Sequence, residues 1–198
     1  MARTIAKDHD EKRSHFLKTA ARVFAENGFA RASMAQVAQD CGISKANIYH
    51  YYGSKDALLF DILDSYLRVL RDRLAALPLK DLSPDDKLRA LVRETLLAYR
   101  GMDHEHKIQT EGIPLLAPPQ QSILKAYQRD MVRQMSDVLK EIAGQDLASN
   151  PEKLRAATMS IYGMLNWFYM WNASADEQAR KDYAELVAKL ALGGVSEI

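Results

Sequence analysis

Apolar positions recur three or four residues apart along most of the chain, which is the period of a helix that buries one face. No stretch alternates apolar and polar residues in the way a half-buried strand does. The first helical segment carries one apolar stripe: Phe16, Ala20, Val23 and Phe24. It is expected to end at Asn27–Gly28, because glycine readily adopts the left-handed conformation that stops a helix.

Capping residues and helix breakers divide the rest of the chain. Ser33 and Ser44 are of the type that accepts a hydrogen bond from a helix N-terminus, so they predict short helices over 34–40 and 45–51. Longer helices are expected over 55–77, 84–100, 120–142, 152–172 and 176–192. Glycine and proline are expected to break residues 101–119 into short pieces. Together these patterns predict an all-α fold of about nine helices.

Residues 34–53 have the pattern of a helix-turn-helix. Two short helices that cross closely need a small residue at the crossing, a glycine in the turn and apolar residues at the buried positions. Suitable residues stand at the fourth, fifth, eighth, ninth, tenth and fifteenth positions counted from Met34: Val37, Ala38, Cys41, Gly42, Ile43 and Ile48. Cys41 is expected to act as a small buried hydrophobe. An ordinary helical hairpin is the alternative interpretation.

The second helix of this pair has a polar face rich in hydrogen-bond donors. Six residues contribute to it: Ser44, Lys45, Asn47, Tyr49, His50 and Tyr51. Lys and Asn side chains bond to base edges in the major groove, and tyrosine hydroxyls bond to phosphate oxygens. Ser33 and Lys55 stand at helix N-termini, where free amides favour a phosphate, although a helix cap and a solvated charge are their alternative roles. The pattern predicts double-stranded DNA as a partner.

The segment ASMAQVAQDCGISKANIYHYYGSKDALL (32–59) resembles the DNA-binding signature of the TetR family of bacterial transcriptional repressors, and LKTAARVFAENGF (17–29) is similar to that family's first helix. The resemblance implies an all-helical homodimer with a three-helix head, a small molecule bound in the body, and a four-helix interface from the last two helices of each subunit. It carries the family's DNA contacts over to Ser33, Lys45, Ala46, Tyr49, His50 and Lys55. Tyr51 and Tyr52 stand where many members have His-Phe; Tyr52 is expected to keep a core role, whereas Tyr51 leaves the base preference open.

Three further segments resemble particular branches of that family. MART (1–4) and YHYYGSKDALLFDIL (49–63) are similar to repressors of phenylacetate breakdown, which sense phenylacetyl-CoA. GMLNWFYMWN (163–172) resembles acyl-CoA-responsive branches. The resemblance implies a repressor that binds a palindromic operator and is released by a CoA thioester. A different hydrophobic effector, such as a fatty acyl-CoA or an efflux-pump drug, is the alternative.

The body of the chain is rich in aromatic and thioether side chains. Such residues are typical of an ordinary core, and collectively they favour a deformable cavity for a flat or acyl ligand. The expected ligand-binding residues are Tyr66, Tyr99, Met102, Tyr127, Met131, Tyr162, Asn166, Trp167 and Met170. The phosphates of CoA need cations, for which Arg100, Lys107, Arg129 and Arg133 are candidates, with a solvated charged face as the alternative.

The last two long helices carry apolar stripes of their own. A helix that is apolar on two faces is either central to one subunit or shared with a partner. The expected dimer interface comprises Leu154, Ile161, Leu165, Phe168, Tyr183, Val187 and Leu190. The functional division is expected near residue 54, with a helix-turn-helix DNA-binding domain over 1–54 and a ligand-binding and dimerisation domain over 55–198.

The charge distribution and the single cysteine are consistent with a DNA-binding protein of this kind. The net charge is +1, but residues 1–56 hold nine Lys/Arg against six Asp/Glu, and the remainder holds 18 against 20. A single cysteine cannot form an internal disulfide, and the charged first 14 residues are unlike a secretory signal, so a cytoplasmic protein is expected. The most apolar window, 160–171, is too short to span a bilayer.

Enzymatic and metal-binding interpretations have little in their favour. DHEH (103–106) suggests a metal site, but alternate residues of a helix point to different sides, so His104 and His106 would need a loop to share an ion. The sequence has no phosphate-cradling glycine loop, nucleophile elbow or dinucleotide fingerprint. An acyl-CoA hydrolase or transferase is the rival class. The expectation is a repressor that is not an enzyme and holds neither metal nor cofactor.

Overall fold

The structure, a computed structural model, describes residues 2–143, 145–172 and 175–195, and their side chains except those of 2–12, 145, 146 and 195. Met1, which opens the MART segment, lies outside these residues. Within this range the chain forms nine α-helices of seven residues or more, one four-residue helix, one 3₁₀ turn and no strand. The prediction of an all-α fold with about nine helices is therefore confirmed.

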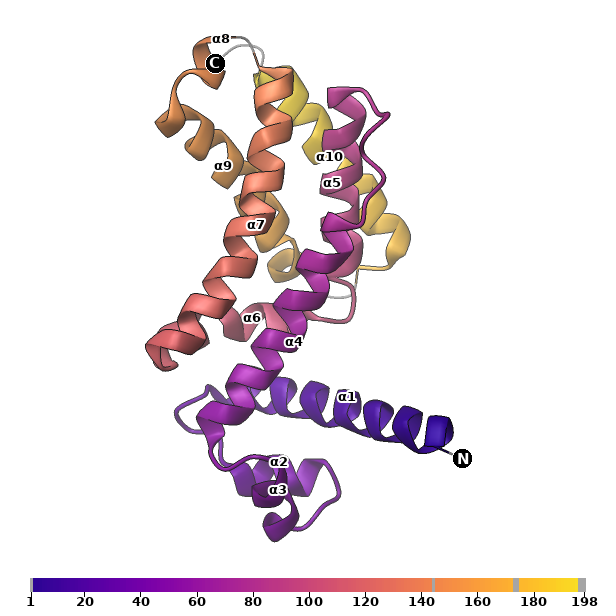
Figure 1. Ribbon diagram of the computed structural model, residues 1–198, viewed down its shortest axis with the longest axis vertical. Helices are drawn as coiled ribbons and strands as arrows, with labels where there is room; N and C mark the ends of the chain where they lie inside the picture. The colour runs from indigo at the N-terminus through magenta and orange to yellow at the C-terminus, as the bar shows by residue number, and fades with distance from the viewer. Residues whose placement is uncertain (1, 144, 173–174, 196–198) are drawn as a thin grey trace. The chain divides into compact units, whose positions relative to one another are not determined.

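The helices are, in chain order, α1 (Ala2–Asn27), α2 (Met34–Asp40), α3 (Lys45–Tyr51), α4 (Lys55–Ala75), α5 (Pro84–Ala98), α6 (Asp103–Gly112), α7 (Pro118–Ile142), α8 (Gln145–Ala148), α9 (Pro151–Trp171) and α10 (Glu177–Val195), with the 3₁₀ turn η1 (Ile113–Leu115) before α7 (Figure 1). The predicted bounds of α2 and α3 coincide with the observed ones. Residues 101–119 are divided into short pieces as expected, namely the ten-residue helix α6, the turn η1 and the start of α7. Gly101, with φ of 72°, and Gly112 stand before and at the end of α6 rather than within it.

The described helices group into two compact units. The first comprises Met1–Leu67 and His104–Leu124, and the second comprises Arg68–Asp103 and Lys125–Ile198. Helix α4 contributes its first part to one unit and its last part to the other. The packing units thus differ from the functional division expected near residue 54, which remains a prediction.

In the first unit, the helix-turn-helix packs on the apolar stripe of α1. Ala20, Val23 and Phe24 are buried as expected, and Phe16 is half-buried. The α2–α3 pair buries Val37, Ala38 and Ile48, while Cys41 is only half-buried, so it is not the buried hydrophobe that the sequence suggested. Gly42 has φ of 67°, and the amide of Ile43 donates to the carbonyl of Ala38 at 2.9 Å, which closes the turn.

Helix α6 packs against α4 in the same unit. A Cβ atom placed on Gly112 would lie 3.3 Å from Leu59 Cδ1, so the missing side chain is what allows the close approach. Nearby, Tyr66 Oη and His106 Nδ1 are hydrogen-bonded at 2.9 Å, and both side chains are buried.

The second unit has its core between α5, α7, α9 and α10. Helices α5 and α10 run side by side in it (Figure 1). The buried face of α10 consists of Arg180, Ala184, Val187, Ala188 and Ala191, and its small residues allow the two helices to lie close together. Helix α9 turns Leu154, Ile161, Leu165 and Phe168 into this core.

The conformation at Gly42 generates a stability prediction. A side chain there is strained because φ lies in the left-handed region, so Gly42→Ala is expected to lower the free energy of unfolding by about 1–2 kcal/mol. Gly53→Ala is the matched control, because Gly53 has no positive φ and a Cβ there meets nothing within 4 Å. Urea unfolding of both variants would measure the difference, and equal midpoints would contradict the assignment.

Candidate functional site

Helix α3 is held to the protein by one buried side chain and exposes the other six. Ile48 is 0% exposed, whereas the remaining residues of the helix are exposed: Lys45, Ala46, Asn47, Tyr49, His50 and Tyr51. A short helix that belongs to a globular core normally buries a wider face. The structure therefore brings together on one exposed surface the residues of α3 that the sequence assigned to DNA.

The N-terminus of α3 is capped as predicted. Ser44 Oγ accepts from the amide of Asn47 at 3.1 Å, so this hydroxyl fixes the first turn of the helix. Ser33 caps α2 in the same way, accepting from Gln36 at 3.2 Å, and it remains exposed. The cap that was the alternative role for Ser33 is therefore present in the structure, as is the cap predicted at Ser44.

The C-terminus of α3 is fixed by Tyr52, a residue that the sequence reading left as a core position. Its hydroxyl donates to Asp61 Oδ2 on α4 at 2.5 Å, and its ring stacks on Phe16 of α1 with 5.5 Å between centroids. The other oxygen of Asp61 accepts from Arg13 on α1. Burial, and then the hydrogen bond to Asp61, raise the pKa of Tyr52 above its ordinary value. Three helices thus meet at the end of α3.

Lys55 makes internal contacts that the sequence did not reveal. Its ammonium donates to the carbonyl oxygens of Phe29 at 2.6 Å, Ala30 at 3.3 Å and Ala32 at 2.9 Å, and it lies 4.4 Å from the centroid of the Phe29 ring. An ammonium group has three protons, so these bonds use all of its donors. Lys55 fixes the loop between α1 and α2, and a phosphate contact would have to replace one of these bonds.

Part of the predicted ligand-binding set meets in the core of the second unit. Tyr99, the C-cap residue of α5, donates to Asn166 Oδ1 on α9 at 2.7 Å. Burial raises the pKa of Tyr99 and of Tyr162, and the neighbouring Tyr162 adds to the shift at Tyr99. Met131 is buried in this unit as well. Neutral tyrosine hydroxyls and an amide are therefore placed within an aromatic core.

The other members of that set lie elsewhere. Tyr66 belongs to the first unit, bonded to His106. Met102 and Tyr127 are half-buried, and the guanidinium of Arg71 lies 4.8 Å from the Tyr127 ring centroid. Trp167 and Met170 are exposed, at 62% and 52%. These five residues thus differ in their burial and in the unit to which they belong.

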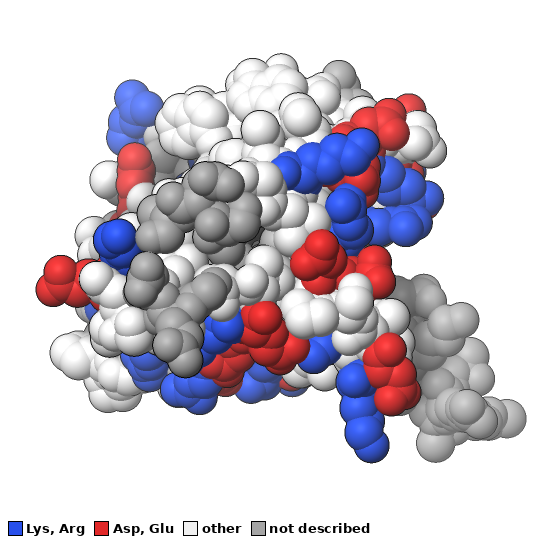
Figure 2. Space-filling model, turned by 90° about the horizontal axis from the view of Figure 1, so that it is seen from above, with Lys and Arg blue, Asp and Glu red and all other residues white. Residues whose placement is uncertain are grey.

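The arginines and the lysine proposed for CoA phosphates are surface residues. Arg100 pairs with Glu177 at 3.0 Å, and Arg133 lies 3.9 Å from Asp130, while Lys107 and Arg129 are exposed. Basic and acidic side chains likewise stand beside one another on the face drawn in Figure 2. The alternative of a solvated charged face describes these residues well.

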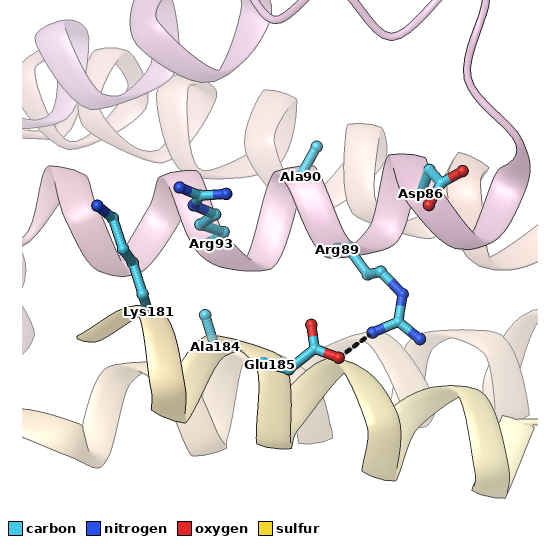
Figure 3. Close-up of a pocket in the computed structure, with 7 residues that line it drawn as sticks. All are labelled: Asp86, Arg89, Ala90, Arg93, Lys181, Ala184 and Glu185. Atoms are coloured by element: carbon cyan, nitrogen blue, oxygen red, sulfur yellow. Dashed lines mark hydrogen bonds and ion pairs between the residues drawn. The ribbon is translucent and has the colours of Figure 1, made fainter. Parts of the chain in front are cut away.

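A groove of about 420 Å³ lies between α5 and α10 and contains none of the predicted ligand residues (Figure 3). Its lining comprises Asp86, Arg89, Ala90, Arg93, Lys181, Ala184 and Glu185. Arg89 is paired with Glu185 at 2.5 Å, and Lys181 with Glu177 at the same distance. The groove therefore has mixed charge, and two of its three cations are already engaged.

The predicted interface residues fall mostly inside the single chain. Leu154, Ile161, Leu165, Phe168 and Val187 are buried, Tyr183 is half-buried and stacks on Phe168, and Leu190 is exposed. The apolar side chains that α9 and α10 expose are Met159, Trp167, Met170, Trp171, Leu186 and Leu190. Both helices are thus apolar on two faces, and the outward face uses largely different residues from those expected.

The DHEH segment does not form a metal cluster in the structure. His106 is buried beside Tyr66, whereas His104 is exposed. Among the residues described, no group of three or more His, Cys, Asp or Glu side chains could hold a metal ion. The helices of the described range also include none with the length and apolar character needed to cross a membrane.

A helix-turn-helix with an exposed second helix, followed by an all-helical body, defines a helical DNA-binding regulator. The chain belongs to the TetR family, because the model for bacterial regulatory proteins of the tetR family matches residues 16–62 and the model for the tetracyclin repressor-like C-terminal domain matches residues 81–195. Members of this family are DNA-binding transcription factors and not enzymes.

Three similar proteins cover nearly the whole chain. The HTH-type transcriptional repressor KstR2 of Mycolicibacterium smegmatis is 23% identical over 94% of this chain and 91% of its own. A TetR-family regulator from Bordetella parapertussis is 28% identical, and its crystal structure has a TM-score of 0.84 over 91% of this chain and 93% of its own. AibR, crystallised with isovaleryl coenzyme A and operator DNA, is 23% identical, with a TM-score of 0.75 over 90% and 97%.

Another relative matches over a shorter stretch. The uncharacterized HTH-type transcriptional regulator YerO of Bacillus subtilis is 35% identical over 65 residues, which are 33% of this chain and 22% of that protein.

The contacts of Lys55 lead to a prediction that separates its two possible roles. Lys55→Met is expected to lower the free energy of unfolding by about 2 kcal/mol, because three carbonyls lose a charged donor. Lys45→Met is the control, because Lys45 is exposed on α3, and it is expected to leave unfolding unchanged. Thermal and urea unfolding would compare them. Wild-type stability of Lys55→Met, together with a smaller salt dependence of DNA binding, would instead support a phosphate contact.

Proposed function

We propose that this chain is a ligand-responsive transcriptional repressor that binds a palindromic operator as a homodimer and is released by a CoA thioester. Phenylacetyl-CoA is the proposed effector, and phenylacetate catabolism, in the cytoplasm, the proposed process. The observation that carries the DNA-binding part is the exposure of six of the seven residues of α3 around a single buried Ile48.

Helix α3 has the dimensions and chemistry of a recognition helix. An α-helix with its side chains is about 10–12 Å in diameter, which fits a major groove about 12 Å wide. Lys45 and Asn47 lie in the first turn, where they reach base edges, and the small Ala46 allows close approach of the helix to the groove. Tyr49, His50 and Tyr51 supply donors for phosphate oxygens and neighbouring bases. Residues 1–54 would act as the DNA-binding domain.

A second copy of the chain is needed for useful affinity and for a palindromic site. Two recognition helices related by a twofold axis read half-sites about 34 Å apart. The exposed apolar side chains of α9 and α10 support a homodimer through these helices, since water-exposed residues such as Trp167, Leu186 and Leu190 gain free energy when a partner covers them. Tyr183 and Leu190 remain from the interface residues expected from sequence.

The proposal of a CoA thioester rests on two kinds of support. The second unit offers a core of aromatic, thioether and neutral polar side chains, including Tyr99, Tyr162 and Asn166, which suits an acyl group with one polar carbonyl. AibR, which has the same fold, was crystallised with isovaleryl coenzyme A. The phenylacetyl group is proposed from the resemblance of residues 49–63. A fatty acyl-CoA or an efflux-pump drug is the alternative effector.

Release requires the effector to prefer a conformation that does not fit the operator, because a ligand of equal affinity for both states shifts nothing. Helix α4 is proposed to transmit the change. It begins at Lys55, directly after the helix-turn-helix, and its last part belongs to the unit that contains the proposed effector residues. Residues 55–198 would act as the ligand-binding and dimerisation domain.

The effector proposal predicts that phenylacetyl-CoA weakens operator binding at least tenfold, a coupling free energy of about 1.4 kcal/mol or more. Free phenylacetate and free CoA are the controls and are expected to have little effect at the same concentration. Fluorescence anisotropy of a labelled operator fragment would measure the three affinities. If phenylacetate released the operator equally well, or if no CoA ester released it, the proposed effector would be contradicted.

The homodimer proposal predicts that charges on the outward face of α10 separate the subunits. Leu186→Glu combined with Leu190→Glu is expected to give a folded monomer that binds a half-site weakly, because the carboxylates would be desolvated in the interface. Val69→Glu is a matched control, since Val69 on α4 is 57% exposed, as Leu190 is. Light scattering after size exclusion would report the mass. A dimeric double variant would refute this interface.

A further inference from the structure

Arg180 is the most deeply buried charged side chain that the structure describes. It stands on α10, is 2% exposed, and faces the core of the second unit together with Ala184 and Val187. Its guanidinium carbon lies 5.7 Å from the centroid of the Phe168 ring on α9. A buried arginine is expected to be fully hydrogen-bonded, because removal of its charge from water is costly.

The hydrogen bonds of Arg180 fall short of that expectation. Nη1 reaches the carbonyl of Leu96 at 3.4 Å, and Nη2 reaches Asp103 Oδ1 at 3.5 Å, both of them long for bonds to a charged donor. Nε is buried and has no hydrogen-bond partner in the structure. A buried donor left unpaired destabilises the conformation that contains it, so an acceptor brought to this position would be bound with a gain in free energy.

The surroundings of Arg180 coincide with the polar part of the aromatic core. Leu96 lies one helical turn before Tyr99 on α5, and Tyr99 is bonded to Asn166 on α9, the helix that carries Phe168. The unpaired donor therefore belongs to the same region of the second unit as the tyrosine and amide groups of the proposed effector site. It was not among the residues that the sequence assigned to a ligand.

We propose that Arg180 recognises the acyl carbonyl oxygen of the effector thioester by donating a hydrogen bond from its unpaired N–H. This inference rests on the proposed function, because it identifies how a CoA thioester would be read. Asp103 sets the chemistry of the acceptor. Its carboxylate already faces Arg180, so a second carboxylate would be repelled, whereas a thioester carbonyl adds an acceptor without adding charge. The site therefore favours the thioester over the free acid.

The test compares two probes on two proteins. Phenylacetyl-CoA carries the carbonyl oxygen, and S-(2-phenylethyl)-CoA is the thioether that lacks it. Calorimetry with the full-length dimer is expected to show the thioester binding at least about tenfold more tightly than the thioether to the wild type. Arg180→Met, which removes the donors and keeps the side-chain length, is expected to bind both probes equally, at the affinity of the thioether.

Two further variants guard against a trivial loss of binding. Arg180→Lys keeps the charge next to Asp103 but not the Nε–H, so it is expected to fold even if Arg180→Met does not, and to lose the preference for the thioester. Arg155→Met changes an exposed arginine on α9 and is expected to keep the preference for the thioester. Operator affinity without effector should stay within about twofold of wild type in all three variants, which checks that each variant is folded and dimeric.

The outcomes distinguish this inference from the proposed function. If the wild type prefers the thioester and Arg180→Met and Arg180→Lys do too, Arg180 is a structural residue and the inference fails while the proposed function stands. If the wild type binds both probes equally, the carbonyl is not recognised and the inference fails in the same way. If the wild type binds neither, the proposed CoA effector fails and the inference fails with it.

Discussion

Helix α3 is fixed in place although only one of its seven side chains, that of Ile48, is buried. One isoleucine contributes about 2–3 kcal/mol when buried, which is too little to order an isolated helix of two turns. The ends of the helix supply the rest. Ser44 caps the first turn, and Tyr52 connects the last turn to α1 and α4 through Phe16 and Asp61. Because both ends are fixed, the middle of the helix is free to expose its polar side chains.

Local signals explain which features the sequence could predict. The bounds of α2 and α3 follow from Ser33, Ser44 and Gly42, whose effects act within a few residues of the chain. The contacts of Lys55 with the loop at 29–32 and of Tyr52 with Asp61 join different helices, so no local pattern reports them. Gly101 and Gly112 do break the chain where expected, but the sequence pattern predicted no bounds for the ten-residue helix α6 between them.

Periodicity alone could not separate the inward from the outward face of α9 and α10. Both helices are apolar on two sides, so the stripe of Leu154, Ile161 and Leu165 could equally have faced a partner. Burial in the single chain assigns that stripe to the core and leaves Trp167 outside it. The same ambiguity affects charge. The sequence suggests Arg100 and Arg133 as possible phosphate ligands. The buried arginine is instead Arg180, which lies on the inward face of α10, four residues before Ala184.

The hydroxyl of Tyr52 has a consequence for the conditions under which the protein can work. Burial and the neighbouring carboxylate of Asp61 raise the pKa of the Tyr52 hydroxyl, so it remains protonated and able to donate at neutral and moderately alkaline pH. Changes of pH near neutrality therefore do not remove the proton that Tyr52 donates to Asp61.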